Sequence, residues 1–525
     1  MYTVIRTAAT EDDETVLQDA LIEFIDIAEI EPKFFVPKFK EVFSNTLDIV
    51  GKTDFTNPSI RQQPVQFYVS IIERVPSIAR KDTDMLNSLF QLIFQLMVDI
   101  DADIEESWLK PKDGFKDNEE GEEGEDNVNF GKGCIDQLIS AVGDEICLPM
   151  LSSIVNETMK NDSDWRYKNA GLMAFSQVGE YIDDIQKIGL MVPVVLQHLD
   201  HPNPKIRYSA LHCLGQISDD MTEDFQETFG KDVLPVLIAH IDDAVPRVSA
   251  HCCSAITNFM DGSSEELVTP FMGDISAKMG KLMNSGISIQ KENSVTAFAS
   301  TAVVIKERFD AHFPETVDLL LNCLNENPQP EFRQFRAQVI EAMTLISSSV
   351  SQEVFMTQSE KVIQAMLFIQ KSNMDANDPQ RSYLLSAWQR VCLIMKGSFV
   401  KFLPEILPPI LSMATLKPEM GIEGQGAADI SDVLQEVKAD DSKEKKHNIM
   451  TDEIEEKDTA IQMLVVFIEE LGAGIGTYVE QISEIFLSLT QYYASDNIRS
   501  TTAGALPSSL KCMKEANPGN IAGIQ

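Results

Sequence analysis

Three acidic residues recur at similar places in the sequence, each with an amide side chain three residues before it. The acids are Glu180, Asp219 and Asp261, and the amides are Gln177, Gln216 and Asn258. The stretches that contain them, 164–180, 203–219 and 245–261, each begin near a basic residue and continue through small and apolar residues. Carboxylates and amide oxygens accept hydrogen bonds from ammonium groups. The recurrence therefore points to binding of cationic side chains, a role that packing does not require.

These residues would form a ladder if the three stretches are stacked helices. Within 203–219, Tyr208, His212, Gln216 and Asp219 follow helical spacings on a face separate from the apolar one. In a solenoid made of helix pairs, the second helix of each pair lines the concave side, and neighbouring second helices lie about 10 Å apart. An extended lysine-rich peptide, at about 3.3 Å per residue, could place lysines at this spacing. We therefore predict a basic-peptide site at Glu180, Asp219, Asp261, Asn258, Gln216, Tyr208, Gln177 and Asp220.

The alternative is that an acid at a helix end is only solvated surface, and for any single acid this interpretation is favoured. One exposed ion pair contributes only ~0.2–1 kcal/mol, so useful affinity needs several contacts together. Three acids in register, each with its amide, favour binding. Ala250 and Val303 occupy ladder positions without a polar group, so the ladder is expected to end near the fourth repeat.

Other conspicuous residues have structural explanations. We expect Arg166, Lys205 and Arg247, at the starts of the three stretches, to bridge neighbouring repeats through acids such as Asp200 or Asp242. Trp388 fits either the core or an exposed platform for a lysine stem. The eight cysteines form no CxxC pair, and most lie in apolar runs, which indicates buried free thiols.

The sequence gives no reason to predict an enzyme. It contains no HExxH motif, no Walker motif and no arrangement of Ser, His and Asp or of Cys and His that suggests a nucleophile. The glycines of 471–476 follow a helical pattern and fit a helix-terminating turn. We accordingly predict no metal and no cofactor.

The elements that must position the ladder are helices. Apolar residues recur three and four apart, as in 233–241 and 460–471, and the helices come in pairs. Echoes of the second helix occur at 57–75, 287–302, 330–346, 378–394 and 495–510, and 185–199 reads as a first helix. A pair period of roughly 40–47 residues is typical of HEAT and armadillo repeats. We therefore predict an all-α fold, an α-solenoid of HEAT repeats.

We predict one continuous repeat array over residues 1–525. Two polar segments interrupt it, an acidic loop at 113–127 and an insertion at 421–457 that carries a short helix at 430–437. Neither segment marks a domain boundary. Both are polar stretches with few apolar anchors.

Charge restricts the partners. The 525 residues carry 82 acidic and 43 basic side chains, a formal net charge of −39. Such a field disfavours nucleic acid and anionic lipid and favours cationic ligands. The sequence has no signal peptide at its start and no run of about 18 apolar residues. We expect a monomer of the cytosol or nucleus.

Several stretches resemble the importin-beta (karyopherin-beta) family. DWRYKNAGLMAFS resembles the DWRYRDAAVMAFG segment of importin beta. HPNPKIRYSALHCLGQISDD and PRVSAHCCSAITNF are similar to the importin-five branch, also called karyopherin beta three. So are DPQRSYLLSAWQRVC, FLPEILPPILSMATLKPE and EEKDTAIQML. The resemblance covers most of 10–515.

The resemblance implies a nuclear transport receptor made of HEAT repeats. Such receptors carry basic cargoes, such as histones or ribosomal proteins, through nuclear pores and release them to Ran-GTP. Acids and amides on the inner helices of the importin-five branch hold cargo lysines, and Glu180, Asp219 and Asp261 match that pattern, with Asn258, Gln216 and Tyr208 as neighbours. The resemblance thus implies binding of nuclear localisation signals and shuttling between cytoplasm and nucleus.

Family members are usually about twice this length, with a Ran-binding arch at the N-terminus. The chain is therefore expected to be a central fragment or truncated form, in which Ran-GTP and nucleoporin binding is in doubt. A competing hypothesis is a HEAT scaffold of the phosphatase-regulatory or chromosome-associated type, which binds folded partners through its inter-repeat turns.

Overall fold

The computed structural model describes residues 2–11, 13–40, 42–43, 59–114, 125–182, 184–189, 191–372, 374, 378–416, 441–492 and 494–517. These residues form α-helices joined by short turns and 3-10 helices, and no strand occurs within the described ranges. The predicted all-α fold is confirmed, and the helix pairs form an α-solenoid of HEAT repeats. The chain divides into two compact units, Met1–Ala297 and Phe298–Gln525, with the boundary inside one helix.

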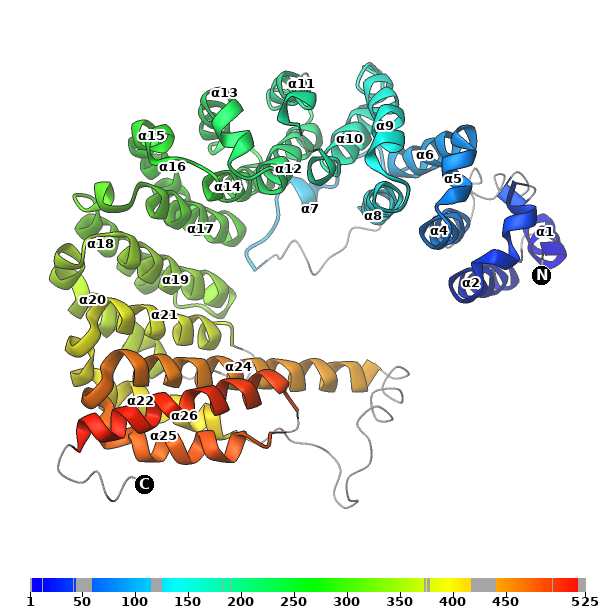
Figure 1. The fold of residues 1–525 in the computed structure, drawn as a ribbon. Helices are drawn as coiled ribbons and strands as arrows, with labels where there is room; N and C mark the ends of the chain where they lie inside the picture. Colours follow the sequence, from blue (N-terminus) through cyan, green and yellow to red (C-terminus); the bar gives the residue numbers. More distant parts are fainter. Residues whose placement is uncertain are drawn as a thin grey trace. The chain divides into compact units, whose positions relative to one another are not determined.

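Unit 1 contains two rows of helices (Figure 1). We call the helices that contain the recurring stretches 164–180, 203–219 and 245–261, together with the corresponding helices of the other repeats, the second-helix row. This row consists of α2 (Glu14–Ile30), α4 (Ser59–Arg74), α8 (Glu125–Val142), α10 (Trp165–Phe175), α12 (Pro204–Asp220), α14 (Pro246–Asp261) and the start of α17 (Ser288–Ile305). The first-helix row consists of α6 (Thr83–Val98), α9 (Asp144–Thr158), α11 (Val192–His198), α13 (Asp224–His240) and α16 (Met272–Ser285). The remaining helices are α1 (Tyr2–Glu11), α5 (Ser77–Lys81), α7 (Glu106–Leu109) and α15 (Glu265–Val268).

Unit 2 continues the same alternation. Its first helices are α18 (Phe313–Glu326), α20 (Gln352–Gln370), α22 (Leu403–Thr415) and α25 (Gly476–Leu489). Its second helices are α19 (Arg333–Ser349), α21 (Gln380–Met395), α24 (Asp441–Leu471) and α26 (Asp496–Ala516). Each second helix packs on the next, α19 on α21, α21 on α24 and α24 on α26.

Local sequence explains where the second helices begin. Asn203 accepts a hydrogen bond from the amide of Lys205, and Pro204 takes the first helical position of α12. Asp164 caps α10 in the same way through the amide of Arg166. Side-chain caps and an initial proline satisfy or remove the amides that a helix start leaves unpaired. The similarity among the three recurring stretches therefore arises partly from residues that begin helices.

Small residues then let neighbouring second helices approach closely. A Cβ atom on Gly215 of α12 would lie 3.1 Å from the Cα of Ala255 on α14. Such a contact is tighter than most Cβ contacts, so a larger residue would require the neighbouring helix to move by a few tenths of an ångström. The close crossing fixes how the last turns of α12 and α14, which carry the predicted ladder, lie beside each other.

Several expectations differ from the structure in detail. Among the described residues of 185–199, 185–187 form a 3-10 helix and Val192–His198 form α11, in place of one continuous helix. Arg207, two positions after the expected Lys205, bridges repeats, because its Nε and Nη2 donate to the carboxylate of Asp243 at 2.7 and 2.9 Å. Arg166 instead pairs with Asp164 of its own repeat, and Asp242 pairs with Lys278 and Lys281. The bridging cation thus lies two residues further along α12 than the sequence suggested.

The two predicted interruptions fall largely outside the described residues. Residues 115–124 of the acidic loop and 417–440 of the insertion, with its predicted short helix at 430–437, are not described. Residues 125–127 begin α8, and residues 441–457 form the first part of α24. The polar sequence of 441–457 therefore belongs to a helix that continues into the apolar run at 460–471.

Trp388 and the eight cysteines are all buried. Trp388 is 1% exposed, and its Nε1 donates to the Oε1 of Gln370 at 2.8 Å, so it belongs to the core. All eight cysteines are buried and form no disulfide, as predicted. Burial raises the pKa of the Cys134 and Cys253 thiols to about 12. These thiols are therefore poor nucleophiles.

One stretch, Ile454–Leu489, is long and apolar enough to cross a membrane by length and composition alone. It contains most of the apolar part of α24 and all of α25. Its buried residues in α24 include Ala460, Ile461, Met463, Leu464 and Phe467. Because α24 packs against α21, α22 and α26, this apolar surface is used within unit 2.

Candidate functional site

The three acids of the ladder are exposed at the same end of three consecutive repeats. Asp219 lies in the last turn of α12, and Asp261 is the last residue of α14. Glu180 lies in the 3-10 helix η3 (Gly179–Tyr181), because α10 ends at Phe175 and does not reach the acid as the sequence suggested. Asp219 and Asp261 therefore lie in α-helices, whereas Glu180 lies in a 3-10 helix at the corresponding end of its repeat.

Asp220 holds the Glu180 segment against α12. Its carboxylate accepts a hydrogen bond from the backbone amide of Glu180, and its Oδ2 lies 2.7 Å from the position that a Cβ on Gly179 would take. Burial raises the pKa of Asp220, while a hydrogen bond from Gln216 opposes that rise and the charges of Glu180 and Asp219 add to it. Asp220 is partly buried, so its main role is to position Glu180.

The three amides each donate a hydrogen bond inside the protein. Gln216 Nε2 donates to Asp220 Oδ1 at 2.7 Å, and Asn258 Nδ2 donates to the carbonyl of Gly215 at 3.2 Å. Gln177 Nε2 donates to Ser176 Oγ at 2.9 Å. Each amide thus uses one of its two N–H donors within the fold and retains a carbonyl oxygen that can accept a hydrogen bond. The amides thus support an acceptor-rich surface beside the exposed acids.

Two residues that sequence reasoning missed extend this acidic surface toward α8. Tyr181 donates from its hydroxyl to Asp136 Oδ1 at 2.5 Å, and both side chains are partly buried. Burial and this hydrogen bond raise the pKa of Tyr181. The pair ties η3 to α8 directly beside Glu180. Asp136 lies outside the recurring stretches, so the sequence does not indicate its hydrogen bond with Tyr181, 45 positions away.

Tyr208 lies apart from the acids. It is 11 positions before Asp219 on α12, about 16 Å along the helix at 1.5 Å per residue. Its ring stacks on His251 at 4.0 Å between centroids and meets the edge of Trp108 at 5.7 Å. Its proposed equivalents, Asn169 and Ala250, are buried in helix contacts. Of the predicted site residues, Gln216, Asp220 and Glu180 are linked by hydrogen bonds, Gln177, Asp219, Asn258 and Asp261 lie toward the same ends of their repeats, and Tyr208 lies apart from them.

A histidine pair fills the space between Tyr208 and the acids. His212 and His251 stack at 5.5 Å between centroids, and Lys132 Nζ lies 2.9 Å from His212 Nε2. Burial, together with the charge of Lys132, lowers the pKa of His212 to about 3 and that of His251 to about 4. Neutral His212 therefore accepts a hydrogen bond from Lys132 through Nε2.

This pair predicts an acid-sensitive unit 1. A histidine in the unfolded chain has a pKa near 6.5. Below that pH the two histidines bind protons in the unfolded chain but stay neutral in the folded protein. The stability contributed by the neutral pair is present above pH 6.5 and is lost as the pH falls toward 4, by up to about 2 kcal/mol per ring at pH 5. Hydrogen exchange of α12 and α14 at pH 7 and pH 5 measures this loss.

The matched variant is His212→Gln combined with His251→Phe. Glutamine keeps an acceptor for Lys132, and phenylalanine keeps the stacking on Tyr208. We expect the pH 5 and pH 7 stabilities of α12 and α14 to be closer together in this variant than in the wild type. An equal pH dependence in both proteins would assign the acid sensitivity to other groups.

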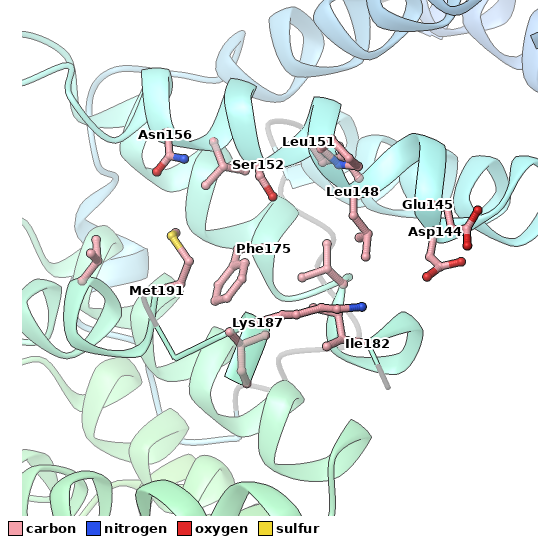
Figure 2. A pocket seen from close by; sticks show the side chains of 15 residues that line it. Asp144, Glu145, Leu148, Leu151, Ser152, Asn156, Phe175, Ile182, Lys187 and Met191 are labelled. Carbon is pink, nitrogen blue, oxygen red and sulfur yellow. The ribbon is translucent and has the colours of Figure 1, made fainter. Parts of the chain in front are cut away.

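A separate cavity of about 470 Å³ lies on the first-helix side of unit 1 (Figure 2). It is formed by α9, the end of α10 and α11, and apolar side chains such as Leu148, Phe175 and Met191 line it. Lys187 also lines it, as do Asp144 and Glu145. None of the residues of the acid ladder contributes to this cavity. Among the described residues, no group of three or more His, Cys, Asp or Glu side chains is placed to hold a metal ion.

Comparisons with known proteins agree with this architecture. Residues 53–167 match the importin repeat family model, and residues 191–221 match the HEAT repeat model. Importin subunit beta-3 of Saccharomyces cerevisiae is 27% identical over 511 residues, which cover 95% of this chain and 45% of that protein. The probable importin-5 homolog of Dictyostelium discoideum is 22% identical over 523 residues, 98% of this chain and 46% of that protein.

A solved structure shows the same fold. The crystal structure of Kap121p superposes with a TM-score of 0.85 at 22% identity and covers 100% of this chain and 50% of that chain. Other crystal structures of Kap121p contain it bound to Pho4p, bound to Nup53p, or with three acidic residues changed to lysine. The chain spans about half the length of the curated relatives it matches.

The fold and these matches define the class of protein, a HEAT-repeat solenoid built from importin repeats. Within that class, the chain is similar to importins of the branch that includes importin beta-3 and importin-5, over about half of their length.

Proposed function

We propose that this chain is the part of a nuclear import receptor that binds lysine-rich nuclear localisation signals. The observation that carries the proposal is the set of three exposed acids, Glu180, Asp219 and Asp261, at equivalent places in consecutive repeats. Each has an amide nearby whose NH2 group is already engaged in the fold. The ligand would run along the last turns of α12 and α14, with lysine ammonium groups meeting successive acids.

Relatives support the same assignment. Kap121p has been crystallised bound to Pho4p, Ste12p and the extreme C-terminus of the phosphatase Cdc14p. The three acidic residues that were changed to lysine in another Kap121p structure are spaced by about one repeat in its numbering. The acids proposed here have a similar spacing. We infer that the partners of this chain are basic cargo proteins, such as histones or ribosomal proteins.

The energetics require several contacts at once. An exposed ion pair contributes only ~0.2–1 kcal/mol. The three acids of the ladder therefore supply useful affinity only when one peptide binds all of them together. The net charge of −39 adds long-range attraction that raises the rate of association with a basic ligand. A receptor of this kind binds without catalysis. It shuttles between cytoplasm and nucleus, and Ran-GTP and nucleoporins are partners of the whole receptor.

Salt dependence tests the proposal. A fluorescent lysine-rich peptide should bind the full chain, and its affinity should fall by about tenfold between 50 and 300 mM NaCl, because exposed charges are screened over this range. A matched peptide with glutamine in place of lysine is the control and should bind far more weakly. Fluorescence anisotropy gives both dissociation constants.

Two outcomes would count against peptide capture. The first is equal affinity for the lysine and glutamine peptides. The second is an affinity for the lysine peptide that does not change with salt. Either result would favour a scaffold that binds folded partners through its inter-repeat turns. Capture of cargo from extract with and without added Ran-GTP then asks whether this half of the receptor also responds to Ran.

A further inference from the structure

Residues 99–114, which follow α6 and contain α7, run across the starts of several second helices of unit 1. At the near end, Arg166 Nη1 of α10 donates to the carbonyl of Ile100 at 2.9 Å, and Trp165 Nε1 donates to the carbonyl of Ala102 at 3.1 Å. At the far end, the amide of Ser288, the first residue of α17, donates to Asp113 Oδ1 at 2.9 Å. Ser288 Oγ in turn accepts from the amide of Gly114 at 2.8 Å. The segment therefore connects α10 with α17 without being part of either.

The middle of this segment is fixed to α12 and α14 by one side chain. Trp108 of α7 is 1% exposed and meets the ring of Tyr208 edge-on. Lys205 Nζ of α12 lies 4.3 Å and the guanidinium carbon of Arg247 of α14 lies 5.3 Å from the centroid of its indole. Cations at such distances from an indole are attracted by its π system. Two adjacent helices thus hold the same ring. Figure 1 shows α7 beside α12 and α14, on the side away from α11 and α13.

The segment has little slack between its attachments. Asp113 lies five positions after Trp108, and five steps along the chain span at most about 17 Å when fully extended. Passing from between α12 and α14 to α17 requires roughly 10–15 Å at ordinary helix spacing. The starts of these helices therefore cannot move apart by more than a few ångström while both attachments hold.

We propose that residues 99–114 act as a strap that sets the spacing of α10, α12, α14 and α17, with Trp108 as its anchor. The proposal rests on the proposed function in one respect: α12 and α14 carry Asp219 and Asp261 in their last turns, and α10 is followed by the segment that carries Glu180. A helix is stiff over its length, so fixing its start restricts the position of its last turn. Trp108 is thus a positioning residue for the ladder, about 16 Å from the acids along α12.

The test uses the full chain and three variants. Trp108→Ala removes the anchor. Trp108→Phe keeps an aromatic ring between the cations and removes an indole N–H that has no hydrogen-bond partner in the structure. Leu237→Ala, in the buried face of α13, is the control for lost stability, because Leu237 is fully buried and belongs to the first-helix row.

The first readout is peptide-spacing selectivity. In a series of peptides with two lysines separated by two to six residues, the wild type should prefer one separation by about tenfold over the poorest, because the rungs are fixed. In Trp108→Ala this ratio should fall below about threefold, whereas Trp108→Phe and Leu237→Ala should keep it. A ratio does not depend on the active fraction, so general destabilisation leaves it unchanged. An unchanged ratio in Trp108→Ala would overturn the positioning role.

The second readout does not involve peptides. Spin labels at Ser153→Cys of α9 and Asn284→Cys of α16 report the spread of unit 1, since both positions are exposed and the eight native cysteines are buried. The distance distribution should broaden in Trp108→Ala and stay narrow in Leu237→Ala. Equal distributions in the wild type and Trp108→Ala would overturn the strap. If the wild type binds none of the peptides while Trp108→Ala broadens, the proposed function fails and the strap stands.

Discussion

Changing Glu180, Asp219 and Asp261 together to lysine should reduce the affinity for a lysine-rich peptide by at least about a hundredfold. Each change removes an attraction and adds a repulsion of similar size, so three rungs together lose about 3 kcal/mol, and 1.4 kcal/mol corresponds to tenfold. All three side chains are exposed. Helix content measured by circular dichroism should therefore be unchanged, while anisotropy with the labelled peptide reports the loss.

A matched control separates the ladder from the overall field. Glu157, Glu227 and Asp232 are exposed acids on the first-helix row of the same unit. Changing these three to lysine alters the net charge by the same amount on another part of the surface. This control should keep its affinity within about threefold at 150 mM salt, where the Debye length is only about 8 Å. Equal losses in the two triple variants would show that the field, and not the ladder, attracts the peptide.

Asp220 is left out of the triple variant for a structural reason. Its carboxylate is partly buried and holds the backbone of Glu180, so a change there would displace a rung as well as remove a charge. Loss of binding in an Asp220 variant would therefore not distinguish direct contact from positioning.

The sequence predicted the repeat architecture because the information is local. The second helices expected at 203–219, 245–261 and 378–394 are observed at Pro204–Asp220, Pro246–Asp261 and Gln380–Met395. Caps and prolines set the first residue of such helices, and apolar spacing of three and four sets the buried face. Both signals lie within one helix, so no knowledge of distant contacts is needed.

The places where prediction failed depend on contacts between distant segments. Tyr208 follows the helical spacing of the ladder, yet Trp108, 100 positions earlier, covers its ring, and no pattern in either stretch indicates this contact. Asp136 was missed for the same reason, because its partner Tyr181 comes from a different repeat. Glu180 was predicted correctly as an exposed acid but on the wrong backbone, since α10 ends at Phe175. Helical periodicity gives the face of a residue but not what covers that face.

The largest effect on stability is expected from Arg207→Ala. Arg207 forms two hydrogen bonds to Asp243 across the interface between repeats, and their side chains are only 15% and 5% exposed. It also donates to the carbonyl of His201 at 2.9 Å. Removing the guanidinium leaves the Asp243 carboxylate buried without its cation, which costs about 3–5 kcal/mol. Hydrogen exchange should show faster opening of α12 and α14, with α19 and α21 of unit 2 as internal references.

The double variant Arg207→Met with Asp243→Asn identifies the cause of this loss. Methionine fills much of the volume of the arginine stem, and asparagine can still accept the hydrogen bond from the Val245 amide that Asp243 now accepts at 2.9 Å. A neutral pair avoids the buried uncompensated charge, so the double variant should be more stable than Arg207→Ala by about 2 kcal/mol or more. If the double variant is as unstable as the single one, the lost hydrogen bonds to the turn carbonyls, and not the stranded carboxylate, account for the effect. The inter-repeat role of Arg207 would then be to hold its own turn rather than to join α12 to the next repeat.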